Sequence, residues 1–297
     1  MRWSPRRNLD EQARVGIVVL AIAFLLAGDR RLSPDYSKTP VLFVHGHGMD
    51  PEGWQTLIRH LVRIGYPPPY LHAVRIAPNT MANAHAAATV IQPAAEALLA
   101  RAADAARRAG YPGPGPNRLD LVSHSMGAVS SRWYAARLRP DRVRTWISLA
   151  GANHGTNALC PYHDEGAREM CPAFADDPRR SVQLALNGTR LAPLDETPYG
   201  FGADPDGFPS LRPDSRRGIW YFSIRIEPDD WIKPEHSAVL RGAGGLPVDV
   251  SRYASARQTS PGNFLFAAPV DHDSLLEHPD LLGLVAALLA ASDQAGH

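Results

Sequence analysis

Short apolar runs alternate with stretches of helical periodicity from Thr39 onward, and this alternation constrains the fold more than any other feature of the sequence. Such a pattern is typical of parallel strands joined by crossover helices. We expect one strand to begin at residue 119 and others at residues 41–45, 71–76, 143–149, 218–226 and 264–267. Helices are expected at 54–64, 125–139, 279–291 and 82–109, the last interrupted at Pro93. The sequence therefore predicts an α/β fold with a mostly parallel central sheet flanked by helices.

The alternation fails between residues 152 and 217, where Pro, Gly, Asp and Arg dominate. Long irregular segments are uncommon in compact domains and usually carry function. Open α/β sheets bind their ligands at the carboxyl ends of the strands. The 297 residues suffice for one large α/β domain or at most two small ones. We predict a single domain over residues 39–292, in which the segment 152–217 forms a cap over that edge of the sheet.

The first residues of the chain differ from the rest. Arginines within residues 1–14 precede an apolar run over residues 15–28, and charged residues follow it. This order is typical of an export signal, and the run is shorter than the ~20 residues that a membrane-spanning helix needs. We expect residues 1–28 to be a cleaved signal peptide, with a retained membrane anchor as the alternative. The protein would then be secreted or tethered to a membrane.

The charge balance argues against nucleic acid as a partner. Lys and Arg number 31 against 30 Asp and Glu, which gives a formal net charge of +1. No run of like charge forms a stripe that would bind phosphates.

Cys160 and Cys171 are the two cysteines of the sequence and lie in a stretch dense with turn-forming residues. In an exported protein such a pair indicates a disulfide. Neither cysteine has the surroundings of a catalytic thiol or the companions of a zinc site. Two free thiols are the alternative if the chain is not exported.

Residues 119–128 have the pattern of a strand, a sharp turn that holds Ser125, and the start of a helix. This arrangement is the nucleophile elbow, in which the serine adopts a strained backbone. The residues two before and two after the serine must be small, because the chain passes close to itself there. Ser123 and Gly127 meet this requirement, although glycine is more usual at the first position. Ser125 is therefore the candidate nucleophile.

A serine hydroxyl needs a base within hydrogen-bond reach, and a carboxylate must orient that base. In folds with this elbow the three follow in the chain order serine, acid, histidine. His272 comes just after the last expected strand and is the candidate base. The strand at 218–226 leads into Glu227, Asp229 and Asp230, so the residues alone leave the acid open.

An acyl-transfer site also needs two preorganised N–H donors for the oxyanion. The backbone N–H of Met126, directly after the candidate nucleophile, is one candidate. The second is the backbone N–H of His47, in the tight turn after the first strand. We expect His124 and the turn at 153–156 to be scaffold around the pocket.

Taken together, the motifs resemble the class 2 lipases and related secreted esterases of the α/β-hydrolase superfamily. The matching segments span most of the chain from Thr39 to Leu289 and comprise residues 44–48, 121–127, 131–134, 148–156, the cysteine pair, 229–234 and His272. Members of this family often carry an aspartate, two residues, Ile or Val, one residue and Pro. Asp229 fits that spacing with Ile232 and Pro234, and Asp230 does not. The resemblance thus implies Asp229 as the acid.

The resemblance implies hydrolysis of carboxylic esters, often lipids such as acylglycerols, through an acyl-enzyme and with no metal or organic cofactor. The expected partner is a small-molecule or lipid ester, with association to a membrane or lipid interface as an accompanying expectation and no protein partner implied. A polyester depolymerase or an acyltransferase would use the same triad. From another class, a catalytically silent binding protein could share the fold. The intact serine turn argues against silence, because a decayed site has no physical need for a strained serine.

Overall fold

The computed structural model of the protein describes residues 32–201, 218–244 and 246–295. The predicted export segment at residues 1–28 lies outside the described residues, as do residues 202–217 of the predicted cap. Among the helices of the described ranges, none combines the length and the apolar character needed to cross a membrane.

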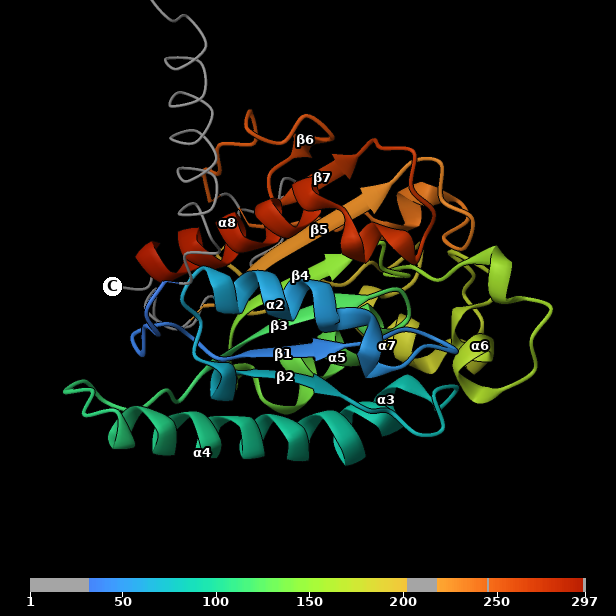
Figure 1. Ribbon diagram of the computed structural model, residues 1–297. Coiled ribbons are helices and arrows are strands. Elements are labelled where there is room, and N and C mark those ends of the chain that lie inside the picture. The colour runs from blue at the N-terminus through green and yellow to red at the C-terminus, as the bar shows by residue number, and fades with distance from the viewer. Residues whose placement is uncertain (1–31, 202–217, 245, 296–297) are drawn as a thin grey trace, which may run out of the picture.

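Seven strands of the described chain form one sheet in the order β2-β1-β3-β4-β5-β7-β6 (Figure 1). Their bounds are β1 Val41–Val44, β2 Leu71–Val74, β3 Leu119–His124, β4 Val143–Leu149, β5 Trp220–Ile226, β6 Ala256–Ser260 and β7 Asn263–Phe266. Every neighbouring pair is parallel except β6 and β7. The prediction of a mostly parallel sheet is confirmed.

Helices cover both faces of this sheet, as Figure 1 shows. Successive residues of a strand point to opposite faces, so each face has its own apolar core. Val41 of β1 belongs to the core beneath helices α2 (Gln55–Arg63) and α8 (Pro279–Ala295). Its neighbour Leu42 belongs to the core beneath α4 (Gln92–Arg108). The strand β1 is buried on both sides, which explains its unbroken apolar sequence.

The long helix predicted at residues 82–109 is divided. Helix α3 (Asn83–Ala86) passes through a π-helical turn at Ala87–Ile91 into α4, whose first turn contains Pro93. Pro93 has no N–H to donate to the preceding turn, and the helical hydrogen-bond pattern changes in the π-helical turn just before it. Gly110 follows α4 with φ of 72°, a conformation that ends many helices.

Short turns of 3-10 helix connect the larger elements, at Pro51–Trp54, Pro68–Tyr70, Pro140–Arg142, Asn157–Leu159, Pro178–Arg180, Glu235–Ala238 and Ser274–Glu277. The edge strand β6 is one element that the sequence did not indicate. Four of its five residues are exposed, so it shows no apolar alternation. Its polar sequence suits an edge position, where an apolar strand would invite pairing with another chain.

The predicted irregular cap contains two short helices, α6 (Glu165–Met170) and α7 (Ser181–Asn187). Each is too short to show helical periodicity in the sequence. Their buried side chains share one apolar cluster with Met126 of the serine turn. Cys160 and Cys171 form a disulfide, as predicted. The described part of the cap is thus packed on the segment that carries the candidate nucleophile.

Candidate active site

Ser125 lies in the turn between β3 and helix α5 (Gly127–Trp133), with a backbone φ of 57°. Residues other than glycine rarely adopt this left-handed conformation, and the surrounding structure must hold it in place. The Ser125 N–H donates to the carbonyl oxygen of Leu149 at 3.1 Å, and its carbonyl oxygen accepts from Ala152 at 3.2 Å. The helix predicted from residue 125 begins at Gly127 because Ser125 itself is part of the turn.

The small residues that flank Ser125 are required by close packing. A Cβ atom at Gly127 would lie 2.3 Å from the carbonyl oxygen of His45 and 2.7 Å from that of Val44. No side chain fits there. The buried Ser123 replaces the more usual glycine, and its hydroxyl is paired with that of Ser131 in α5 at 2.7 Å. The departure at this position is therefore accommodated by a hydrogen bond.

The turn after β1 packs directly against the serine. A Cβ atom at Gly46 would lie 2.6 Å from the Cβ of Ser125 and 3.1 Å from its Oγ. His45 fixes this turn, since its Nδ1 donates to the carbonyl oxygen of Gly46 and its Nε2 accepts from the N–H of Ile76, both at 3.0 Å. Burial lowers the pKa of His45, which keeps the ring neutral in this arrangement. The next residue along the turn is His47, one candidate for the oxyanion hole.

Asp229 and His272, which are 43 residues apart, meet at the carboxyl edge of the sheet. The His272 Nδ1–H donates to the two carboxylate oxygens of Asp229, at 3.0 and 3.1 Å. The Oδ1 atom of Asp229 also accepts the N–H groups of Trp231 and Ile232, at 2.8 and 2.9 Å. Asp229 and His272 are buried, whereas Asp230 is exposed. The carboxylate is therefore held in place by its own loop.

This geometry leaves one atom of His272 available. Its Nε2 is buried and has no hydrogen-bond partner among the described residues. An imidazole oriented through Nδ1 by a carboxylate can take a proton at Nε2. The arrangement suits general-base chemistry at the sheet edge where Ser125 lies.

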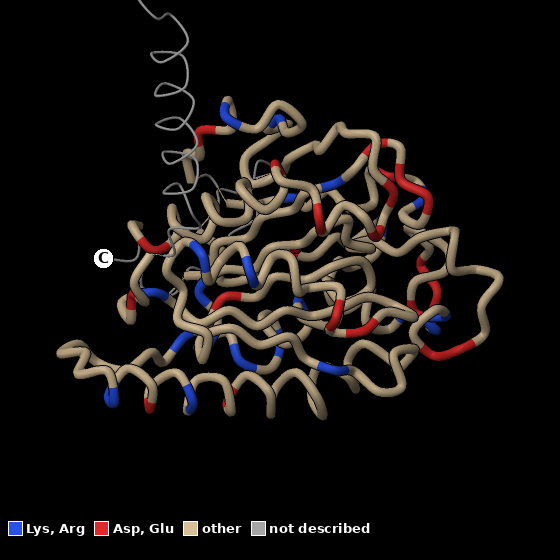
Figure 2. Tube along the Cα trace, in the orientation of Figure 1, with Lys and Arg blue, Asp and Glu red and all other residues tan. Residues whose placement is uncertain are grey.

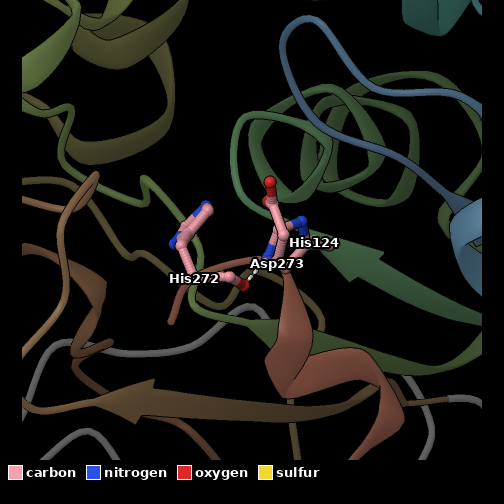
Figure 3. A group of neighbouring side chains, drawn as sticks. All are labelled: His124, His272 and Asp273. Atoms are coloured by element: carbon pink, nitrogen blue, oxygen red, sulfur yellow. Dashed lines mark hydrogen bonds between the residues drawn. The ribbon is translucent and has the colours of Figure 1, made fainter. Parts of the chain in front are cut away.

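His124, the residue before Ser125, contacts the backbone of His272 (Figure 3). Its Nε2–H donates to the backbone carbonyl oxygen of His272 at 2.9 Å, and the two ring centroids are 4.4 Å apart. Its Nδ1 faces the sulfur of Met49 at 3.1 Å. Complete burial, together with the nearby His272, holds the pKa of His124 well below its usual value. His124 is thus a neutral hydrogen-bond donor to the loop of the candidate base.

Figure 3 also shows Asp273 beside this histidine pair, and ligand atoms of the three residues lie within 4.8 Å of one another. Such proximity is found in metal sites. Here, however, the Nε2–H of His124 is hydrogen-bonded to a carbonyl oxygen, and the Nδ1–H of His272 is hydrogen-bonded to Asp229. We therefore interpret the group as a hydrogen-bonded unit.

The turn at residues 153–156 has the scaffold role that was expected of it. The Asn153 side-chain amide donates to the carbonyl oxygen of Ala238 at 2.7 Å. The hydroxyl of Thr156 donates to the carbonyl oxygen of Trp231 at 2.5 Å and accepts the N–H of Lys233 at 2.9 Å. These bonds hold the loop that carries Asp229. The sequence indicated that Thr156 and His124 lie near the pocket, but not which residues they bond.

Two cavities lie in the cap region. One of about 1100 Å³ is lined by residues that include Tyr162, Glu169 and the disulfide. Another of about 640 Å³ is lined by residues that include His154 and Phe174. Neither is lined by Ser125, Asp229 or His272. The candidate catalytic residues are therefore separate from both cavities.

The sheet order, the strained serine turn at the end of a parallel strand and the flanking helices define the α/β-hydrolase fold. A family model described as palmitoyl protein thioesterase matches residues 40–187. This match supports an ester-hydrolysing enzyme.

Two solved structures illustrate the similarity. Lipase BlEst2 from Bacillus licheniformis in its mature form is 17% identical, with 86% of this chain and 94% of that chain covered and a TM-score of 0.47. Carboxylesterase CesB (YbfK) from Bacillus subtilis is 14% identical, with 86% and 85% covered and a TM-score of 0.45. No curated protein matches the sequence significantly. These likenesses are too weak to bear on the substrate.

Proposed function

We propose that the protein is a serine hydrolase that cleaves carboxylic esters, with Ser125 as nucleophile, His272 as base and Asp229 as the residue that orients the base. The observation that carries the proposal is the hydrogen bond from His272 Nδ1 to Asp229, which leaves the buried Nε2 of His272 unpartnered within the described structure. Ser125 lies at the same sheet edge in a strained turn.

The proposed reaction has two acyl-transfer steps. The Oγ of Ser125 bonds to the ester carbonyl carbon while His272 Nε2 takes its proton, and the carbonyl oxygen becomes an oxyanion. The N–H groups of His47 and Met126 hold that oxyanion. The bond to the alcohol oxygen then breaks, and His272 returns the proton to the leaving alcohol. Water repeats the sequence on the acyl-enzyme, which releases the acid and restores Ser125.

For the substrate we propose acylglycerols or related lipid esters, in keeping with the resemblance to class 2 lipases. The family match at residues 40–187 favours a second candidate, thioesters, since that family is described by thioesterase activity. Both substrates use the same nucleophile and oxyanion site. The two substrate classes can be distinguished with a matched pair, ethyl butyrate and S-ethyl thiobutyrate. The ratio of the kcat/KM values for these two compounds shows which class the protein prefers.

We further propose that the protein acts outside the cytoplasm, secreted or tethered to a membrane and near a lipid interface. The disulfide between Cys160 and Cys171 supports export, because disulfides persist in oxidising compartments.

The test of the proposed function is covalent labelling of the full chain by a fluorophosphonate, with the modified residue located by mass spectrometry. We expect label at Ser125 and no turnover of p-nitrophenyl butyrate by Ser125→Ala. Ser251→Ala, which changes an exposed serine far along the chain, is the matched control and should label and turn over normally. Unchanged turnover in Ser125→Ala would falsify the proposal. Absence of both label and turnover in the wild-type protein would favour the silent binding protein.

A further inference from the structure

Three aromatic rings, those of His47, Tyr162 and Trp231, contact one another in a row that we call the aromatic ledge. The ring centroids of His47 and Tyr162 are 5.6 Å apart, and those of Tyr162 and Trp231 are 6.2 Å apart. Tyr162 is 42% exposed and Trp231 is 39% exposed. Single exposed apolar side chains are ordinary on protein surfaces, whereas neighbouring exposed aromatic rings form a surface on which an apolar ligand can pack.

The ledge crosses the edge of the sheet at which Ser125 lies. His47 follows β1, and Trp231 follows β5. In the sheet order, β3 and β4 stand between those two strands. Because parallel strands end at one edge, the turn after β3 that holds Ser125 lies between the two ends of the ledge. Tyr162, from the cap, joins them.

Each ledge residue is also held by something other than the contacts between the rings. The Nε2 of His47 is 3.0 Å from the carboxylate of Asp164, which also caps α6 by accepting the N–H of Ala167. Tyr162 lies within the loop that the disulfide closes. The backbone of Trp231 donates to Asp229 and accepts from Thr156. The backbone segments that carry the two exposed rings are therefore held in place, which reduces the conformational entropy lost when a ligand packs on the rings.

The charged side chains near the ledge bear on the net charge of the ligand that can bind there. The segments that follow β5 and β7 carry Glu227, Asp229, Asp230, Glu235, Asp271, Asp273 and Glu277. The nearby Lys233 is paired with Glu235 at 2.7 Å. Figure 2 shows acidic segments at this edge of the sheet. Glu227 is paired with Arg225, and Arg168 and Arg179 line the cavity that Tyr162 borders. The remaining acidic side chains favour an uncharged substrate over an anionic one at the Trp231 end of the ledge.

We propose that the ledge, through Tyr162 and Trp231, binds an aryl group of an uncharged ester and so determines specificity at the Ser125 site. This inference rests on the proposed function. Aromatic rings favour another aromatic ring over an alicyclic one of the same size, because ring edges and faces carry complementary partial charges. Tyr162 and Trp231 are substrate-binding residues in this proposal, and His47 also supplies its backbone N–H to the oxyanion.

The test uses ester pairs that differ in aromaticity at nearly constant size and leaving group. Benzyl acetate is compared with cyclohexylmethyl acetate, and ethyl phenylacetate with ethyl cyclohexylacetate, by pH-stat. We expect the wild-type protein to prefer the aryl ester of at least one pair by about fivefold in kcat/KM, mainly through KM. Tyr162→Leu and Trp231→Leu should reduce this preference to near one.

Phe174→Leu is the matched control. Phe174 is also exposed and in the cap, but its ring stacks on His154 and His236 and not on a ledge residue. This variant should keep the aryl preference. Equal kcat/KM values for both members of each pair would overturn the inference, as would an aryl preference that remains in both Tyr162→Leu and Trp231→Leu. Fluorophosphonate label at Ser125 would in either case still support the proposed function.

Direct binding tests the ledge even if hydrolysis fails. In the Ser125→Ala protein, benzyl alcohol should shift the indole N–H signal of Trp231 saturably in NMR spectra, with the signal assigned from Trp231→Leu. Cyclohexylmethanol should shift it at higher concentration only. Equal binding of the two alcohols, or a Trp231 signal that neither alcohol moves, would count against the aryl site.

Discussion

The Nε2–H of His124 donates a 2.9 Å hydrogen bond to the backbone carbonyl oxygen of His272, a residue 148 positions further along the chain. His124 directly precedes Ser125, so the end of one strand positions both the candidate nucleophile and the loop of the candidate base. The bond requires the proton of the His124 ring to be on Nε2. Burial lowers the pKa of His124, so the ring is neutral and its Nδ1 carries no proton. A second positive charge beside an imidazolium at His272 is thereby avoided.

This relationship predicts that His124→Phe lowers kcat for an activated ester by about tenfold, the scale expected when a buried hydrogen bond is lost. KM should change little, because His124 does not reach the substrate in the proposed mechanism. His124→Gln, which retains an N–H donor, should recover part of kcat. Steady-state kinetics across pH would show the acid limb shifted in His124→Phe alone. Equal kcat in both variants, with an unmoved pH profile, would assign His124 a merely structural role.

Asp229 and Asp230 should respond differently to loss of charge. Asp229→Asn should reduce kcat by about three to four orders of magnitude, since the imidazole loses both its orientation and its counter-charge. Asp230→Asn changes an exposed side chain and should stay within about twofold. Kinetics with p-nitrophenyl butyrate and thermal unfolding of both variants provide the measurement. The reverse order of effects would reassign the acid to Asp230.

Gly46 should tolerate no side chain, because a Cβ atom there would lie 2.6 Å from the Cβ of Ser125. Gly46→Ala is expected to displace the serine or the oxyanion turn and to lower kcat by about 10²-fold. Gly53→Ala is the control, since its Cβ would meet its nearest neighbour at 3.8 Å, an ordinary contact. Its activity should match the wild-type protein. Full activity in Gly46→Ala would show that the turn is not packed as described.

Glu196 should make stability depend on acid pH. Burial raises the pKa of this carboxyl, but hydrogen bonds from His154 at 3.0 Å and from the Arg241 backbone at 2.9 Å outweigh it and lower the pKa from 4.5 to about 2. A lowered pKa in the folded state stabilises the protein above pH 4.5, and this stability is lost as pH falls towards 2.

Thermal unfolding of the wild-type protein and Glu196→Gln between pH 6 and pH 3 tests this dependence. Tm should be lower in Glu196→Gln at pH 6, and the gap should narrow as the solution is acidified. Two curves that stay parallel over this range would mean that Glu196 contributes nothing to the acid dependence.

Much of the fold could be predicted from the sequence, because burial imposes local periodicity on a chain. The continuous apolar run at β1 and the small residues around Ser125 are patterns within a few consecutive residues, so the sequence shows them directly. The strand β6 could not be predicted, because an exposed edge strand has no buried face and therefore no apolar pattern in its sequence. Helices α6 and α7 are too short to show one.

The sequence by itself determined where Ser125 and His272 stand relative to strands and helices, and the family spacing separated Asp229 from Asp230. Only the tertiary structure decided which side chains meet. The bonds from His272 to Asp229 and from His124 to His272, and the contact of Tyr162 with Trp231, join residues that are distant in the chain. Such contacts depend on the order of strands in the sheet and on how the cap packs, and no local pattern of polar and apolar residues encodes either.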